Sequence, residues 1–223
     1  MWSRLILLVT SISFLILPIC SSLYADDPIE GENYIWIDLG DKDEGLLLSL
    51  AQNGGDGITE ADEQAGVDCK KLPFPYNGPG HNHMYFDVDD SFIFGGDNEV
   101  WIVTEYFDLG EGIDCQYDSN GAGPVDGAFR GAGDGAFPEL KPGNTETWQT
   151  HIWPMPDARF ENRGNGHDFR FSTHAKGDMW LNRVWIFLYE PPDPFDPDNA
   201  GFPQAVQPAG KLTATWGSLK STP

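Results

Sequence analysis

Short runs of aromatic and β-branched residues, separated by glycine, asparagine, aspartate or proline, recur along most of this chain. Such runs favour strands, and the residues between them favour turns. We find no long helical pattern, and only Ile58–Gly66 is compatible with a short helix. The sequence therefore predicts an all-β fold, an antiparallel β-sandwich of two sheets. The clearest predicted strands are Tyr34–Leu39, Met84–Val88, Val100–Phe107, Ile113–Tyr117, Thr147–Trp153, Asp168–Phe171 and Met179–Tyr189.

Two of these runs indicate how the strands face the core. In Val100–Phe107, large apolar residues occupy both alternating faces, so we expect a central strand that is covered on both sides. In Asp168–Phe171 the alternation is strict, which places the two phenylalanines inward and the two charged residues outward.

Residues 1–25 are typical of a bacterial signal peptide. One cation, Arg4, precedes the apolar run Leu5–Pro18, and small and polar residues follow. The apolar run is shorter than the roughly 20 residues of a membrane-spanning helix, and no later run is long enough. We therefore expect a secreted or cell-surface protein. Cys20 leaves a lipid-anchored form as an alternative, although the bulky Ile19 before it disfavours lipoprotein processing.

The remainder divides into two parts. Residues 26–190 contain all the predicted strands and form the expected sandwich domain. Residues 191–223 are predicted to be a proline-rich linker and a short tail. The tail ends in Lys211–Lys220, which carries its own tryptophan and is a candidate contact for a protein partner.

The chain is strongly acidic. Removal of the signal, which carries one cation and no acid, changes the formal charge from −22 to −23. This charge disfavours nucleic acid and anionic membranes as partners. Calcium, cationic surfaces and neutral or weakly charged glycans stay compatible with it, and solubility in a salty medium also explains it.

Two cysteines, Cys69 and Cys115, remain after signal removal. In an oxidising compartment an isolated pair most simply forms one disulfide, which is the interpretation we adopt.

Several motifs follow one another in a recognisable order along the chain. They are Met84–Phe92 (MYFDVDDSF), Val100–Phe107 (VWIVTEYF), Tyr117–Ser119 (YDS), Trp148–Thr150 (WQT), Pro156–Phe160 (PDARF), Asn162–Arg163, Asp168–Arg170 (DFR) and Asn182–Val184 (NRV).

This order resembles a galactose-binding-like jelly-roll module of the kind attached to bacterial extracellular glycosidases and other polysaccharide-degrading enzymes. The resemblance extends from Tyr34 to Tyr189. It implies a two-sheet antiparallel sandwich that often holds structural calcium and often binds sugars. We recognise no enzyme domain among residues 1–223, and the Gly121–Gly135 insertion has no counterpart, so the resemblance does not identify the ligand.

Three carboxylates, Asp87, Asp89 and Asp90, come at the end of one predicted strand. Such a loop offers the oxygen ligands that calcium prefers, which makes these residues the candidate metal site. The alternative is that Asp89 and Asp90 hydrogen-bond the following turn.

The loop Asn162–Asp168 is the candidate ligand site. It combines turn-forming glycines with planar polar side chains that suit sugar hydroxyls. An alternative role for Arg163 is to pin the loop by pairing with Asp157 or Asp168. Trp153 and Trp180, beside breaks in the strand pattern, are the candidate stacking rings. The candidate ligand residues are Asn162, Arg163, Asn165, His167, Asp168, Trp153 and Trp180.

The sequence thus predicts a secreted, non-catalytic carbohydrate-binding protein that recognises an extracellular polysaccharide. One alternative is a structural or adhesion module that contacts another protein. Another is a polysaccharide lyase or hydrolase, in which His83, Tyr85 and Arg163 would abstract a proton from a uronate. We find no nucleophile elbow and no phosphate-binding loop.

Overall fold

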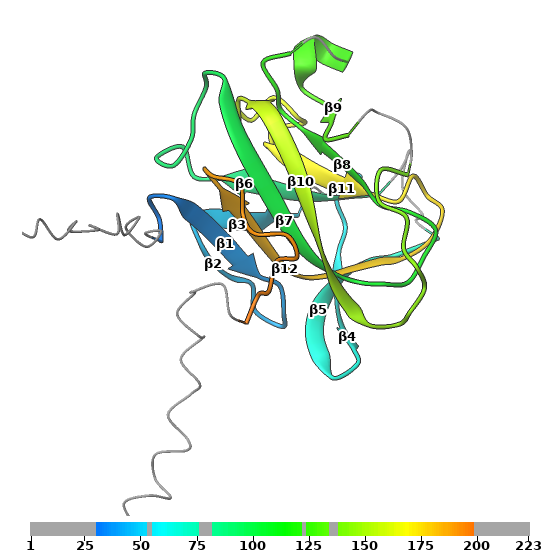
Figure 1. The fold of residues 1–223 in the computed structure, drawn as a ribbon. Coiled ribbons are helices and arrows are strands. Elements are labelled where there is room, and N and C mark those ends of the chain that lie inside the picture. The colour runs from blue at the N-terminus through cyan, green and yellow to red at the C-terminus, as the bar shows by residue number, and fades with distance from the viewer. Residues whose placement is uncertain (1–29, 53–54, 76–81, 122–123, 134–137, 199–223) are drawn as a thin grey trace, which may run out of the picture.

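The computed structural model describes residues 30–52, 55–75, 82–121, 124–133 and 138–198. The predicted signal peptide, which includes Cys20, lies outside these residues, and so do the whole predicted tail and the second part of the predicted linker. The described residues form two antiparallel sheets packed as a sandwich, which confirms the predicted fold class (Figure 1). Among them we find no helix that could cross a membrane by its length and apolar character.

The larger sheet has seven strands. In the order β10-β7-β12-β1-β2 neighbouring strands are hydrogen-bonded, and β4 joins through β5. One edge of β12 pairs with β7, while its other edge is shared by β5 and then β1. The strands are β1 (Tyr34–Asp38), β2 (Glu44–Leu46), β4 (Glu60–Gln64), β5 (Val67–Leu72), β7 (Asn98–Phe107), β10 (Trp148–Ala158) and β12 (Met179–Phe187).

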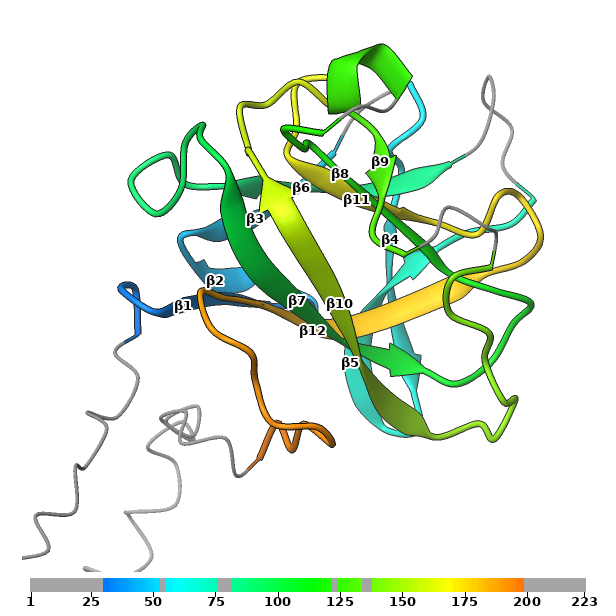
Figure 2. The ribbon, with the colours of Figure 1, turned by 45° about the horizontal axis from the view of Figure 1, so that its top comes forward.

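The smaller sheet has five strands in the order β3-β6-β11-β8-β9. Figure 2 shows β6, β11, β8 and β9 side by side, forming the second layer behind β7 and β10. The strands are β3 (Leu48–Ala51), β6 (His83–Val88), β11 (Phe169–Ser172), β8 (Asp114–Tyr117) and β9 (Arg130–Gly131), with one 3₁₀ turn, η1 (Pro124–Gly127), before β9.

The main core lies between the sheets because each strand sends alternate side chains inward. Met84, Phe86 and Val88 of β6 belong to it, whereas the residues between them face outward. The rings of Phe86 and Phe169 stack with centroids 4.9 Å apart, and such a pair adds about 0.5–1.5 kcal/mol beyond the burial of its area. This packing holds β6 and β11 in register and thereby positions their outward side chains.

A second apolar cluster covers the outer face of the larger sheet. Val103, Trp185 and Phe187 of this face pack against Phe195, which is only 4% exposed. Phe195 belongs to the stretch that follows β12 (orange in Figure 1) and that the sequence assigned to the linker. The first part of that predicted linker is therefore packed on the sandwich.

Each end of every predicted strand agrees with the structure to within five residues, and several ends are identical. As expected, β7 is central and covered on both faces, since Val100 and Ile102 lie in the main core and Val103 in the outer cluster. The largest extension is in β10, which continues through Pro154 and Pro156. Prolines are tolerated there because β10 is an edge strand of its sheet.

The segment Ile58–Gly66, which the sequence pattern allowed to be a short helix, instead contains strand β4. Ala65 and Gly66 both have positive φ, at 52° and 81°, as a two-residue turn between antiparallel strands requires. They close a hairpin of β4 and β5, which extends from the sandwich in Figure 1. Pairing with β5 overrides the weak helical pattern.

The predicted disulfide is also wrong, because Cys69 and Cys115 are free and buried. Cys69 lies in β5 of the larger sheet, beside Phe107 and Trp180, whereas Cys115 lies in β8 of the smaller sheet, in the main core. Burial raises the pKa of Cys69 to about 12 and that of Cys115 well above its usual range. Both thiols therefore act as small apolar core groups rather than reactive ones.

Candidate functional site

Arg163 in the predicted ligand loop is a structural residue. Its Nε and Nη2 donate to Oδ1 of Asp118 over 2.9 and 2.6 Å, and Nη2 also donates to the carbonyl of Ser119 over 2.7 Å. The Asp118 carboxylate is completely buried. Arg163 thus pins the loop, as one of the two sequence interpretations held, although its partner is neither Asp157 nor Asp168.

Asp168 is structural as well, being only 1% exposed. Its two oxygens accept the backbone N–H groups of Val88 and Asn162, each over 2.9 Å. Burial raises the pKa of Asp168 to about 6; these hydrogen bonds lower it, and the charges of Asp87 and Asp118 raise it further. The side chain fastens the loop to β6 and does not face a ligand.

Asn165 and His167, in contrast, reach the outer face of the smaller sheet. The amide nitrogen of Asn165 donates to the Tyr85 hydroxyl over 2.8 Å. Nδ1 of His167 lies 2.7 Å from Oδ1 of Asp87. Asn165 has φ of 59°, and Gly166 beside it has φ of 88° with open space around it. This tight turn brings both side chains back over β6.

Tyr85 is the centre of this outer face. The strand register aligns Tyr85 of β6, Arg170 of β11 and Gln116 of β8 in one row. The Tyr85 hydroxyl accepts from Arg170 Nη1 over 2.8 Å and donates to Oδ2 of Asp56 over 3.1 Å. We call His83, Tyr85, Asp87, Gln116, Asn165, His167 and Arg170 the Tyr85 cluster.

Two imidazole rings flank the tyrosine. The ring centroids of His83 and His167 lie 5.5 and 4.9 Å from that of Tyr85. His83 Nδ1 also lies 3.4 Å from Oδ2 of Asp56. Burial raises the pKa of Tyr85 above its ordinary value, although Arg170 lowers it. At neutral pH the hydroxyl is therefore protonated and serves as a hydrogen-bonding group.

Arg170 and Gln116 are the members that sequence reasoning missed. The strict alternation in β11 had already placed Arg170 outward, but only the pairing of β11 with β8 brings it to Gln116. Nε and Nη2 of Arg170 both donate to Oε1 of Gln116, over 2.9 and 2.7 Å. The guanidinium carbon lies 4.2 Å from the ring centroid of Phe129, which provides an apolar surface beside the polar groups.

The Tyr85 cluster is only partly satisfied by its own contacts. Within the described residues, the amide N–H₂ of Gln116 and the amide oxygen of Asn165 have no hydrogen-bond partner. Arg170 uses three of its five N–H groups in hydrogen bonds to Gln116 and Tyr85, which leaves two N–H groups without a partner among these residues. Gln116 and Arg170 are half-buried and Asn165 is exposed. These groups form a fixed array of donors and acceptors on the sheet surface.

Trp153 and Trp180 do not serve as exposed stacking rings, which corrects the sequence interpretation. Trp153 is 2% exposed in the main core, and its Nε1 donates to the Thr104 hydroxyl over 3.0 Å. Trp180 is 8% exposed and packs against Phe107, while its Nε1 donates to Asp62. Both lie on strands of the larger sheet, where inward alternation and the β4–β5 hairpin bury them.

The candidate metal residues do not converge. Asp87 contacts His167, and Asp89 accepts from the backbone N–H of Ser91, which is the turn-forming alternative. No group of three or more histidine, cysteine or acidic side chains that could hold a metal occurs in the described part of the chain. Asp87, Asp89 and Asp90 therefore do not gather as a three-carboxylate site in the described residues. Calcium binding stays a prediction, which thermal melts with chelator and with excess calcium test.

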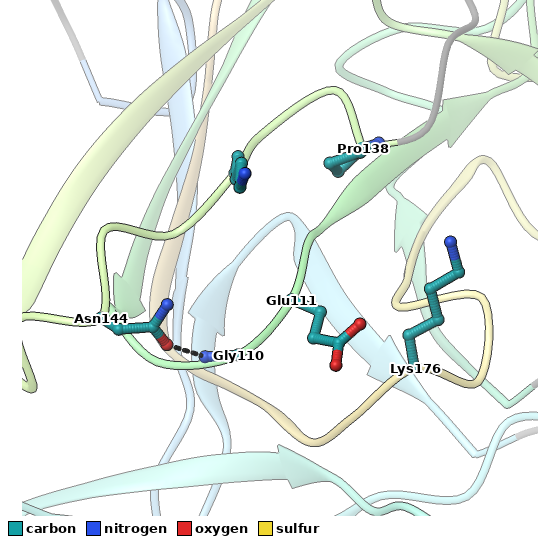
Figure 3. Close-up of a pocket in the computed structure, with 6 residues that line it drawn as sticks. Gly110, Glu111, Pro138, Asn144 and Lys176 are labelled. Atoms are coloured by element: carbon teal, nitrogen blue, oxygen red, sulfur yellow. Dashed lines mark hydrogen bonds between the residues drawn. The ribbon is translucent and has the colours of Figure 1, made fainter.

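A separate pocket of about 400 Å³ lies where the β7–β8, β9–β10 and β11–β12 connections meet (Figure 3). The Asp108 carboxylate holds the β9–β10 connection at one side of the pocket, because it accepts hydrogen bonds from the backbone N–H groups of Gly143 and Thr145 over 2.6 and 3.0 Å. The Asn144 amide oxygen accepts from the Gly110 N–H over 2.9 Å. The lining residues are Gly110, Glu111, Pro138, Lys141, Asn144 and Lys176.

Comparisons with known proteins add no assignment. No model of a known protein family matches the chain, and no curated protein matches it either. The all-β sandwich is shown by the pairing of the strands.

Proposed function

We propose that this protein is a secreted, non-catalytic glycan-binding module of the galactose-binding-like type, and that the Tyr85 cluster is its binding surface. The observation that carries the proposal is the partly satisfied polar array of Gln116, Asn165 and Arg170 around a buried tyrosine. Sugar hydroxyls need donors and acceptors in fixed positions, and planar amide and guanidinium groups supply them.

The surroundings support this reading. The array is built on two paired strands and one hydrogen-bonded loop, so its geometry is set before any ligand arrives, which lowers the entropic cost of binding. The Phe129 ring and the two imidazoles place apolar faces beside the polar groups. Sugars present the same combination of hydroxyl edges and apolar C–H faces.

Affinity electrophoresis against a panel of polysaccharides, followed by calorimetry on the best ligand, tests the proposal. Gln116→Ala and Asn165→Ala each remove one neutral hydrogen-bonding group and should weaken binding about threefold to tenfold. Neither side chain is in the core, so the thermal midpoint should change little. Gln149→Ala, which removes an exposed glutamine from β10 of the other sheet, is the matched control and should bind normally.

Loss of binding in Lys141→Ala or Asn144→Ala, with normal binding in both cluster variants, would instead assign the glycan to the loop pocket. If the unaltered protein binds none of the polysaccharides in the panel, the proposed function is overturned.

A second candidate, a polysaccharide lyase, is favoured by one specific observation. His83, Tyr85 and an arginine do converge, with Arg170 in the place expected for Arg163. The raised pKa of Tyr85 opposes its use as a base. Release of unsaturated uronide ends from acidic polysaccharides, absent in Tyr85→Phe, would establish the lyase in place of the binding module.

A further inference from the structure

Arg170 differs from every other arginine that the structure describes. The other four each pair with a carboxylate of this chain: Arg130 with Asp157, Arg159 with Glu161, Arg163 with Asp118 and Arg183 with Glu105. Arg170 contacts only neutral groups among the described residues, namely the Gln116 amide oxygen and the Tyr85 hydroxyl. The chain has 35 acidic and 13 basic residues, so carboxylates are plentiful. An arginine without a carboxylate partner among the described residues therefore indicates that Arg170 binds an anion of another molecule.

The two carboxylates of this face, Asp56 and Asp87, have hydrogen-bond or ion-pair partners other than Arg170. Asp56 accepts from the Tyr85 hydroxyl and lies beside His83, and Asp87 contacts His167. The guanidinium itself is half-buried beside the Phe129 ring, with its carbon also 5.6 Å from the Tyr85 ring centroid. A cation partly removed from water gains most from an anion that matches its fork of N–H groups. Two N–H groups of Arg170 are left for such a partner.

We infer that the Tyr85 cluster recognises a uronic acid unit, whose carboxylate pairs with Arg170 while its hydroxyls contact Gln116 and Asn165. This inference rests on the proposed glycan-binding function and adds the class of sugar. The formal charge of −22 repels a dense polyanion at long range. The best ligand is therefore a glycan in which uronates are spaced among neutral sugars.

Calorimetry with matched pairs of oligosaccharides tests the inference. Each acidic oligosaccharide, such as glucuronate-substituted xylotriose, is compared with its carboxyl-reduced counterpart, which keeps the stereochemistry and loses the charge. A chelator in the buffer prevents metal bridges between the acidic protein and the acidic sugar. A charge-assisted bond to Arg170 should make the acidic member bind on the order of tenfold more tightly.

Two variants separate a ligand role of Arg170 from a structural one. Arg170→Gln removes the cation. Gln116→Glu keeps the Arg170 cation but gives it an internal carboxylate partner, because the new carboxylate replaces the amide oxygen that Arg170 now contacts. In both variants the preference for the acidic member should fall to near unity. Lys176→Gln, which removes a cation from the loop pocket, should retain the preference.

Equal binding of both members of every pair by the unaltered protein would overturn the uronate inference and leave the glycan-binding function standing. An acid preference that survives in both variants would overturn it too, because the cation would lie elsewhere. Failure to bind any oligosaccharide, acidic or neutral, would overturn the inference together with the proposed function.

Discussion

Arg163 closes over the buried carboxylate of Asp118, 45 residues away in sequence, through two hydrogen bonds to one oxygen. The other oxygen of Asp118 accepts the backbone N–H groups of Glu161 and of Arg163 itself, over 2.9 and 3.2 Å. The ion pair therefore ties the end of β8 to the loop that carries Asn165 and His167. The candidate site depends on this connection even though Arg163 does not face it.

Arg163→Ala should destabilise the fold, because it leaves the Asp118 charge buried without its cation. The expected loss is about 3 kcal/mol of unfolding free energy, which lowers the thermal midpoint by about 10 °C in a domain of this size. Arg159→Ala is the control and should melt almost as the unaltered protein does, because the partner of Arg159 is the partly exposed Glu161 and not a fully buried carboxylate. Equal midpoints for the two variants would contradict a pinning role.

Thiol titration of the unfolded, unreduced mature protein should find two free thiols, since Cys69 and Cys115 lie in opposite sheets and do not pair. In the native protein both should react very slowly, because burial raises the pKa of Cys69 to about 12 and keeps its reactive thiolate rare. The absence of any thiol in the unfolded protein would show that the disulfide forms after all.

The pKa of Asp168, raised by burial to about 6 against an ordinary value of 3.8, links stability to pH. The folded protein holds a proton there over a range in which the unfolded chain has lost it. The contribution of Asp168 to stability is therefore fully present below the unfolded pKa and is lost as pH rises through the folded pKa. The full difference corresponds to about 3 kcal/mol.

Asp168→Asn removes this linkage and isolates it from other titrations. Between about pH 5 and about pH 7.5, the unfolding free energy of the unaltered protein should fall by about 1.4 kcal/mol relative to that of the variant. Denaturant titrations at both pH values measure the difference; the lower one stays above the isoelectric point near 4.2, where precipitation interferes. A difference that does not change with pH would contradict the raised pKa.

Phe195→Ala should lower stability by about 3 kcal/mol, because the ring is buried against Trp185 and Phe187 with centroids 5.2 and 5.6 Å away. Phe94→Ala removes a phenylalanine that is 57% exposed and should have little effect. Truncation after Glu190 should be at least as damaging as Phe195→Ala. Normal melting of the truncated protein would restore residue 190 as the end of the folded domain.

Local patterns in the sequence determined the fold class and the principal strands. Alternation of apolar and polar residues is a property of a single strand, so Asp168–Phe171 reveals its inward phenylalanines and its outward Arg170 without knowledge of any neighbour. The same logic identified β7 as central, because both of its faces are apolar. Strands β2 to β5 were missed because they are short or polar and exist only through pairing with β1, β6 and β12.

Tertiary structure alone decided which polar side chains meet. Asn165 and Tyr85 are 80 residues apart, and Arg170 and Gln116 are 54 apart. They come together because β11 pairs between β6 and β8, a choice set by packing across the whole sandwich. The same packing sent Arg163 to Asp118, buried Trp153 and placed the two cysteines in different sheets. The sequence shows which polar side chains are present, but only long-range strand pairing brings them within hydrogen-bonding distance of one another.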